Sequence, residues 1–212
     1  MHQPLPSEID AIIFDFGGVL FDIDYSAPAR AFKSLGVQNF EGLYSKANQN
    51  DLFDRLEVGT ISNADFLEEL RQLTGGTLTT AQVLWAWNAI LTGIPVGRVE
   101  ALHSLQGRFR CFLLSNTNAI HVAAFEPMVD DAVGLAHFKS AFEKTHYSNE
   151  IGMRKPHPET YLEVCKWHSL TPSRTLFIDD SPQHVEGALK AGLHAYHLVV
   201  EKEDIRDVIA RL

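Results

Sequence analysis

The chain is 212 residues long, and its 45% hydrophobic and 21% charged residues are typical of a soluble globular protein with a packed core. Its 27 acidic residues outnumber its 18 basic ones, and the net charge of −9 argues against non-specific binding to nucleic acid or to an anionic membrane. A small phosphorylated partner remains compatible with this charge, because it needs only a local positive site.

Two further features bear on where the protein works. No apolar segment approaches the length needed to span a membrane, and residues 1–10 lack a basic start followed by an apolar stretch. Cys111 and Cys165 lie within apolar segments, so we expect reduced core thiols rather than a disulfide. These features predict a cytoplasmic protein with no membrane partner, and they leave monomer and homodimer open.

Strand and helix patterns alternate along most of the chain. The apolar runs that predict buried strands cover residues 11–14, 110–114, 175–178 and 194–200, with a weaker candidate at 141–146. The segments after residue 93 that predict helices are 95–106, 119–127, 158–169, 182–191 and 202–212. Strands separated by helices of this length predict an α/β fold with a doubly wound parallel sheet.

The stretch from residue 23 to residue 92 breaks this alternation. It carries helix patterns over residues 27–35, 51–56, 62–71 and 79–91, and no strand-like alternation. We therefore expect a small helical bundle inserted after the first strand. The expected division is a core domain of residues 1–22 and 93–212 and a helical domain of residues 23–92.

Polar groups stand at the ends of the predicted strands. These groups are Asp15, Ser115-Asn116-Thr117 and Asp179-Asp180, and a further group with Lys155, residues 152–157, follows the weaker strand. Because the carboxyl ends of parallel strands meet at one edge of a sheet, we expect these groups to converge although they are far apart in sequence.

Such a set suits the hydrolysis of a phosphate monoester. A carboxylate such as Asp15 can attack phosphorus and form an aspartyl phosphate. Because the carboxylate and the phosphate repel each other, the reaction needs a divalent cation between them. We expect Mg²⁺ to bind Asp15, the Gly17 carbonyl and Asp180, with Asp179 as a direct or water-mediated ligand.

The developing negative charge on the phosphoryl group also needs donors. The Ser115 hydroxyl and the Asn116 amide, just before a helix start, suit that role. Lys155 supplies a compact positive charge that holds both Asp15 and the phosphate. The predicted catalytic residues are thus Asp15, Ser115 and Lys155, and the predicted substrate-binding residues are Ser115, Asn116 and Lys155.

These residues match the motifs of a known family. The motifs Asp15-x-Gly17-Gly-Val, Ser115-Asn-Thr, Lys155-Pro and Asp179-Asp180-Ser resemble, in order and spacing, those of the haloacid dehalogenase superfamily. Finer details resemble its branch of bacterial sugar phosphatases that includes α-D-glucose-1-phosphate phosphatases. The segments that carry this resemblance are Asp22-Ile-Asp24, Leu-Ser-Asn-Thr-Asn118, Gly152-Met-Arg-Lys-Pro156 and residues 179–188. The resemblance implies a Rossmann-like core, a helical cap that selects the substrate, and Mg²⁺-dependent hydrolysis of a small phosphorylated metabolite, with a sugar phosphate expected, through an aspartyl phosphate.

One position departs from the superfamily pattern. Most phosphatases of the superfamily carry a second aspartate two residues after the nucleophile as general acid and base, and here that position is Gly17. Three outcomes follow from the sequence. The enzyme is slow, or Asp22, Asp24 or a substrate hydroxyl takes the role, or the leaving group needs little protonation.

Two other functions remain as alternatives. A haloacid dehalogenase would use the same aspartate against carbon without a metal, but adjacent carboxylates at Asp179-Asp180 would repel its carboxylate substrate. A binding or regulatory protein that keeps the fold without turnover is conceivable because of Gly17.

Overall fold

The structure is a computed structural model that describes residues 5–6, 8–38, 40, 42 and 51–212. Its centre is a parallel sheet in the order β5-β4-β1-β6-β7. The strands are β1 (Ala11–Phe14), β4 (Arg110–Ser115), β5 (Lys144–Tyr147), β6 (Thr175–Asp179) and β7 (His194–His197). The prediction of an α/β fold with a doubly wound parallel sheet is confirmed.

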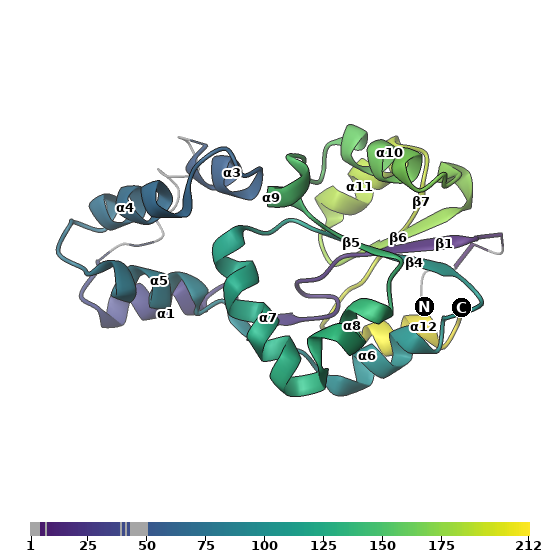
Figure 1. Cartoon of the computed structure of the whole chain (residues 1–212), viewed down its shortest axis with the longest axis horizontal. Coiled ribbons are helices and arrows are strands. Elements are labelled where there is room, and N and C mark those ends of the chain that lie inside the picture. The colour runs from purple at the N-terminus through teal and green to yellow at the C-terminus, as the bar shows by residue number, and fades with distance from the viewer. Residues whose placement is uncertain (1–4, 7, 39, 41, 43–50) are drawn as a thin grey trace.

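Helices cover both faces of this sheet (Figure 1). One face carries α6 (Val96–His103), α7 (Ala119–Val133), α8 (Leu135–Ser140) and α12 (Ile205–Ile209). The other face carries α9 (Ser148–Ile151), α10 (Pro158–Trp167) and α11 (Pro182–Lys190), and the 3₁₀ turn η1 (Pro172–Arg174) precedes β6.

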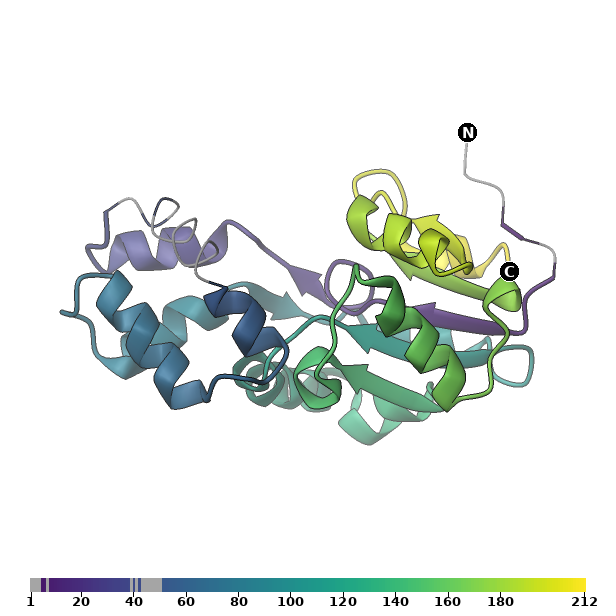
Figure 2. The same cartoon turned by 90° about the horizontal axis from the view of Figure 1, so that it is seen from above.

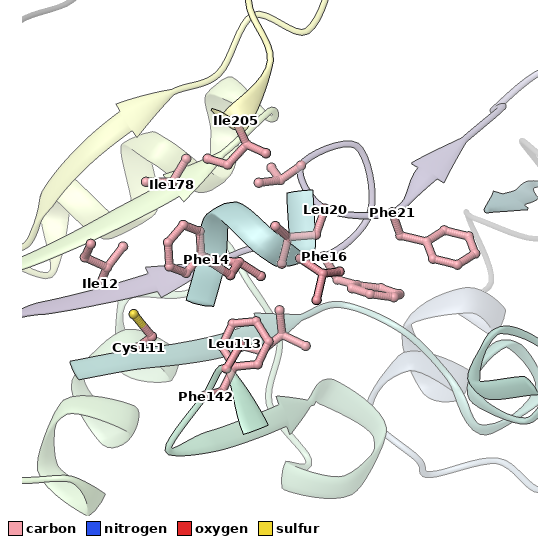
Figure 3. Close-up of a cluster of buried hydrophobic side chains, with 14 of the residues drawn as sticks. Ile12, Phe14, Phe16, Leu20, Phe21, Cys111, Leu113, Phe142, Ile178 and Ile205 are labelled. Atoms are coloured by element: carbon pink, nitrogen blue, oxygen red, sulfur yellow. The ribbon is translucent and has the colours of Figure 1, made fainter. Parts of the chain in front are cut away.

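The central strand alternates its side chains between these two layers. Ile12 and Phe14 join one buried cluster with Leu113 and Ile178, as Figure 3 shows. Ala11 and Ile13 belong to a second cluster on the opposite face. A strand buried on both faces reads as a continuous apolar run, which is why the sequence alone located β1.

The register of the sheet brings three strand ends to one edge. Phe14 of β1 pairs with Leu113 of β4 and with Ile178 of β6. Asp15, one residue further, donates its backbone N–H to the Ile178 carbonyl at 2.9 Å. Asp15 therefore lies between the end of β4 and the Asp179-Asp180 pair.

A bundle of helices lies at one end of the molecule (Figure 2). Among the residues that the structure describes, it contains α1 (Ala27–Ser34), α3 (Leu52–Glu57), α4 (Asn63–Leu73) and α5 (Thr80–Asn88). Its apolar cluster is separate from those of the sheet and is rich in aromatic rings, among them Phe53, Phe66 and Trp87. Ile120 of α7 joins this cluster and connects the two parts of the molecule.

The two chain segments that enter and leave the bundle pair with each other. Strands β2 (Asp22–Ile23) and β3 (Leu91–Gly93) form an antiparallel ribbon. The expectation of helices alone between residues 23 and 92 is wrong here, because strands this short leave no alternation to detect. The expected boundaries at 22/23 and 92/93 fall within this ribbon, and residues 23–92 remain our proposed cap.

Several predicted element ends were also wrong. The helix expected over residues 79–91 ends at Asn88, and the helix expected over 202–212 covers only Ile205–Ile209. The strand expected from residue 141 begins at Lys144, because Ala141 caps the preceding helix α8. Helix α7 continues through Pro127 to Val133, where buried contacts of Phe125 and Val129 offset the missing N–H donor.

Candidate active site

Lys155 lies at the centre of the predicted site. Its side chain is fully buried, and its Nζ donates to Asp15 Oδ1 at 2.6 Å and to Asp179 Oδ2 at 2.7 Å. Burial lowers the pKa of the Lys155 ammonium, but the charges of Asp15 and Asp179 outweigh this effect and hold the pKa above its usual value. Lys155 is therefore charged and joins the ends of β1 and β6.

Two neighbours fix the backbone around Lys155. The Asn116 side chain accepts from the Lys155 N–H at 2.9 Å and donates to the Lys155 carbonyl at 2.9 Å. On the other side, α11 approaches so closely that a Cβ added at Gly187 would lie 2.1 Å from the Pro156 carbonyl oxygen. The Lys155 loop is held from both sides, and the Asn116 side chain contacts the backbone of this loop.

Three carboxylates gather beside this lysine. Asp15, Asp179 and Asp180 each offer an oxygen atom within 4.8 Å of the others. Burial, followed by the charge of Asp179, raises the pKa of Asp15 to about 7 and that of Asp180 to about 6. Lys155 thus does not neutralise the cluster, and oxygen donors with surplus negative charge are what Mg²⁺ prefers.

Asp179 and Asp180 have different surroundings. Asp179 is fully buried, and its oxygens accept from Lys155, from the Ser181 N–H at 2.7 Å and from His184 Nδ1 at 3.0 Å. Asp180 lines a cavity next to Asp15. This arrangement favours Asp180 as a direct metal ligand and Asp179 as the group that positions Lys155.

The two glycines after Asp15 differ in role. Gly18 has a φ of +82°, a conformation that favours glycine, and a Cβ added there would lie 2.1 Å from Asp180 Oδ2. Gly17 lines the cavity, and a Cβ there would approach Ile23 Cδ1 to 3.3 Å. The close approach of Asp180 to the β1 loop therefore depends on Gly18.

A cavity of about 290 Å³ lies between the sheet edge and the helical bundle. Asp15, Ser115 and Asp180 line its sheet side, and Phe53, Leu56 and Trp87 line its bundle side. Asn116 also lines it, next to the buried Ser115. The volume is at the small end of the range for ligand-binding clefts, so the cavity fits a small molecule.

Arg154 joins this cavity to the bundle. Its guanidinium forms ion pairs with Asp54 and, at 2.9 Å, with Glu57 Oε2, both on α3. Burial raises the pKa of Glu57 although the charge of Arg154 opposes this shift. The residue that precedes Lys155 thus lines the cavity and contacts the bundle directly.

Two histidines that are not among the predicted site residues, His121 and His184, also line this cavity. His184 lies in the first turn of α11 and hydrogen-bonds Asp179, within the run that follows Asp179-Asp180. His121 lies in the first turn of α7, a few residues after Ser115. Their placement shortly after a strand end was the available signal.

Comparison with known proteins identifies the family of this constellation. A sequence model of haloacid dehalogenase-like hydrolases matches residues 9–192. The chain belongs to the haloacid dehalogenase-like hydrolase family. The predicted resemblance is confirmed. In the part of the chain that the structure describes, no helix is long and apolar enough to cross a membrane.

Relatives and solved structures from this family cover nearly the whole chain. A D-ribitol-5-phosphate phosphatase of Bacteroides thetaiotaomicron is 29% identical over 188 residues, which are 89% of this chain and 91% of the relative. A predicted family hydrolase from Porphyromonas gingivalis has a TM-score of 0.82 at 33% identity, covering 97% of this chain and 98% of its own. A family enzyme from Bacteroides thetaiotaomicron, solved with magnesium and inorganic phosphate, has a TM-score of 0.79 at 31% identity, covering 92% and 96%.

Proposed function

We propose that the protein is a Mg²⁺-dependent phosphatase that hydrolyses a small sugar phosphate or polyol phosphate through an aspartyl phosphate on Asp15. The observation that carries this proposal is the cluster of Asp15, Asp179, Asp180 and Lys155. Two of its members, Asp15 and Asp180, line a small cavity between sheet and bundle. The phosphatase name of a relative and the magnesium and phosphate in a similar solved structure support it.

Asp15 is the proposed nucleophile. Lys155 donates to its Oδ1 and so orients the carboxylate at the cavity. An Asp15 oxygen attacks phosphorus, the bond between phosphorus and the leaving oxygen breaks, and the phosphoryl group remains on Asp15. Water then attacks phosphorus in the aspartyl phosphate, which releases phosphate and restores the carboxylate.

Three residues would bind the transferred phosphoryl group. The buried Ser115 hydroxyl and the Asn116 backbone N–H are proposed donors at the end of β4, where both residues line the cavity. The Asn116 side chain cannot serve, because it is occupied by the Lys155 backbone. Lys155 is fully buried and does not line the cavity, so it would attract the phosphoryl group by its positive charge beside Asp15.

The carboxylate cluster fits a magnesium ion. Asp15, Asp180 and the Gly17 carbonyl would hold it, and Asp179 would keep Lys155 in place. The bound ion would offset the repulsion between Asp15 and the phosphate. The raised pKa values of Asp15 and Asp180 support this assignment, because they reflect buried carboxylates that repel one another.

The leaving group must obtain its proton without a side chain at position 17. Asp22 is paired with Arg98 at 2.7 Å, and Asp24 holds Ser26 and Arg30. Neither carboxylate lines the cavity, so the structure disfavours both as the general acid. We propose that the leaving oxygen is protonated by water or by a substrate hydroxyl, which predicts modest turnover for leaving groups of high pKa.

A dehalogenase is a weaker candidate. Asp179 and Asp180 surround Asp15 with negative charge, which would repel a haloacid carboxylate. A non-catalytic binding protein would not require a buried lysine aimed at a nucleophile.

The proposal is tested by phosphate release from a panel that contains p-nitrophenyl phosphate, D-ribitol 5-phosphate and hexose phosphates. Release that requires Mg²⁺ and stops with a chelator is expected, and halide release from 2-chloropropionate is not. A folded protein that releases no phosphate from any of these esters would contradict the proposal.

A further inference from the structure

We propose that His121 determines substrate specificity, with Nε2 accepting a hydrogen bond from a hydroxyl of the part of the substrate that carries the phosphate. This inference rests on the proposed phosphatase function, and it names a residue that selects the leaving group. It predicts a preference for hydroxylated phosphate esters over alkyl esters of the same length.

The backbone of His121 is fixed by the same loop that carries the proposed phosphate donors. Asn118 caps helix α7, and its Oδ1 accepts from the Ile120 N–H at 3.1 Å and from the His121 N–H at 3.0 Å. Ser115 and His121 both line the cavity, so a phosphate ester bound at Ser115 would share this cavity with His121.

Asn88 sets the tautomer of the His121 ring. Asn88 Oδ1, at the end of bundle helix α5, lies 2.9 Å from His121 Nδ1. An amide oxygen only accepts hydrogen bonds, so Nδ1 carries the proton and Nε2 carries the lone pair. No described residue forms a hydrogen bond with Nε2.

Aromatic packing sets the plane of the ring. The imidazole stacks on Trp87, with ring centroids 5.2 Å apart and planes 10° apart, and Trp87 stacks in turn on Phe53. Burial lowers the pKa of His121 to about 4, so the ring is neutral near pH 7. The position, tautomer and charge of the His121 ring are thus fixed before any ligand binds.

Most of the bundle side of the cavity is apolar. Phe53, Leu56, Trp87 and Ile90 offer apolar surface there, and Glu57 is already paired with Arg154. A substrate hydroxyl can donate a hydrogen bond to Nε2. An alkyl chain would instead exclude water from Nε2 and leave this nitrogen without a hydrogen bond. A site that hydrogen-bonds a hydroxyl in this way rejects the analogue that lacks it.

The test compares kcat/KM for D-ribitol 5-phosphate with kcat/KM for n-pentyl phosphate, with Mg²⁺ present. His121→Phe keeps an aromatic ring against Trp87 and removes both nitrogens. We expect the ratio of the two values to fall about tenfold or more, and p-nitrophenyl phosphate, a third ester that lacks a hydroxyl, reports whether the variant still hydrolyses phosphate esters. Wild-type protein that turns over none of the three esters would overturn the proposed function itself.

A second variant leaves His121 in place. Asn88→Leu frees Nδ1, so we expect the ratio to fall in the same direction, and to fall no further when combined with His121→Phe. His137→Phe, on α8, is the matched control, because His137 stacks on His103 and does not line the cavity. An unchanged ratio in folded His121→Phe, or in Asn88→Leu where His121→Phe does not fold, overturns the inference, as does an equal loss for both esters.

Discussion

At the scale of single residues, the main feature of the site is its excess of negative charge. Three carboxylates, Asp15, Asp179 and Asp180, meet one buried ammonium, that of Lys155. Lys155 is held by two of them, and the third, Asp180, lines the cavity with Asp15. An uncompensated buried charge is costly, so the cluster is stable as a set of anions only with a further cation or with bound protons.

A substitution at Gly18 tests whether Mg²⁺ binding requires the close approach of the loop after β1 to Asp180. Gly18→Ala would place a Cβ 2.1 Å from Asp180 Oδ2, so the carboxylate has to move. We expect the Mg²⁺ concentration for half-maximal activity to rise about tenfold or more, as is typical when the surroundings of a metal ligand change. Activity measured across a magnesium titration checks this.

Gly36→Ala is the control for this change. Gly36 also has a positive φ, +90°, but a Cβ there meets nothing within 4 Å. Both variants should lose about 1–2 kcal/mol of folding free energy from backbone strain. An equal effect of both variants on the magnesium titration would contradict the proposed role of Asp180.

At the scale of elements, α11 packs closely against the Lys155 loop and fixes its position. Alanine normally stabilises a helix relative to glycine by about 1 kcal/mol. Gly187→Ala should do the reverse, because its Cβ would lie 2.1 Å from the Pro156 carbonyl oxygen and displace the loop. We expect lower thermal stability together with lower kcat.

Gly97→Ala in α6 separates helix propensity from this collision. The nearest atom to its Cβ, Arg206 Nη1, is 3.4 Å away at the end of a flexible side chain. This variant should gain stability and keep its kcat. A Gly187→Ala protein that behaves like Gly97→Ala would show that the contact between α11 and the loop is unimportant.

Some helices and strands could be predicted from the sequence and others could not, for physical reasons. The strand of Ala11–Phe14 was predictable because burial on both faces gives an unbroken apolar run. The ribbon of β2 and β3 was not, because its strands are too short to show a period. The helix predicted to end at about Pro127 continues to Val133 as α7, because tertiary packing there overrides the tendency of proline to end a helix.

The site residues also fall into those that a local sequence pattern predicts and those that it does not. Asp15 and the Asp179-Asp180 pair could be predicted as site residues because they follow apolar runs directly. The contact between the Asn116 side chain and the Lys155 backbone joins positions 39 residues apart, and no local pattern encodes it. His121 escaped notice because its role depends on Asn88, which a different part of the chain supplies.

At the scale of the whole molecule, the bundle has its own apolar core. Phe66 is fully buried there, with its ring 5.1 Å from Trp87 and 6.1 Å from Phe53. Phe66→Ala should cost about 3–5 kcal/mol of stability within the cap, residues 23–92. Because the clusters of the sheet lie elsewhere, the core domain should keep its protection.

Amide hydrogen exchange checks this division of the chain. Exchange should accelerate in α1, α4 and α5 of the Phe66→Ala protein, while β1, β4 and β6 exchange as in the wild type. Uniform acceleration across both parts would contradict the proposed cap as a separate folding unit.

The central claim is that Asp15 attacks phosphorus, and it is tested most directly by replacing that residue alone. We compare Mg²⁺-dependent phosphate release by the wild type and by Asp15→Asn, after circular dichroism has shown that both are folded. The wild type should release phosphate and the Asp15→Asn protein should not exceed background, because an amide cannot form the aspartyl phosphate. Sustained turnover by the folded Asp15→Asn protein would contradict the account.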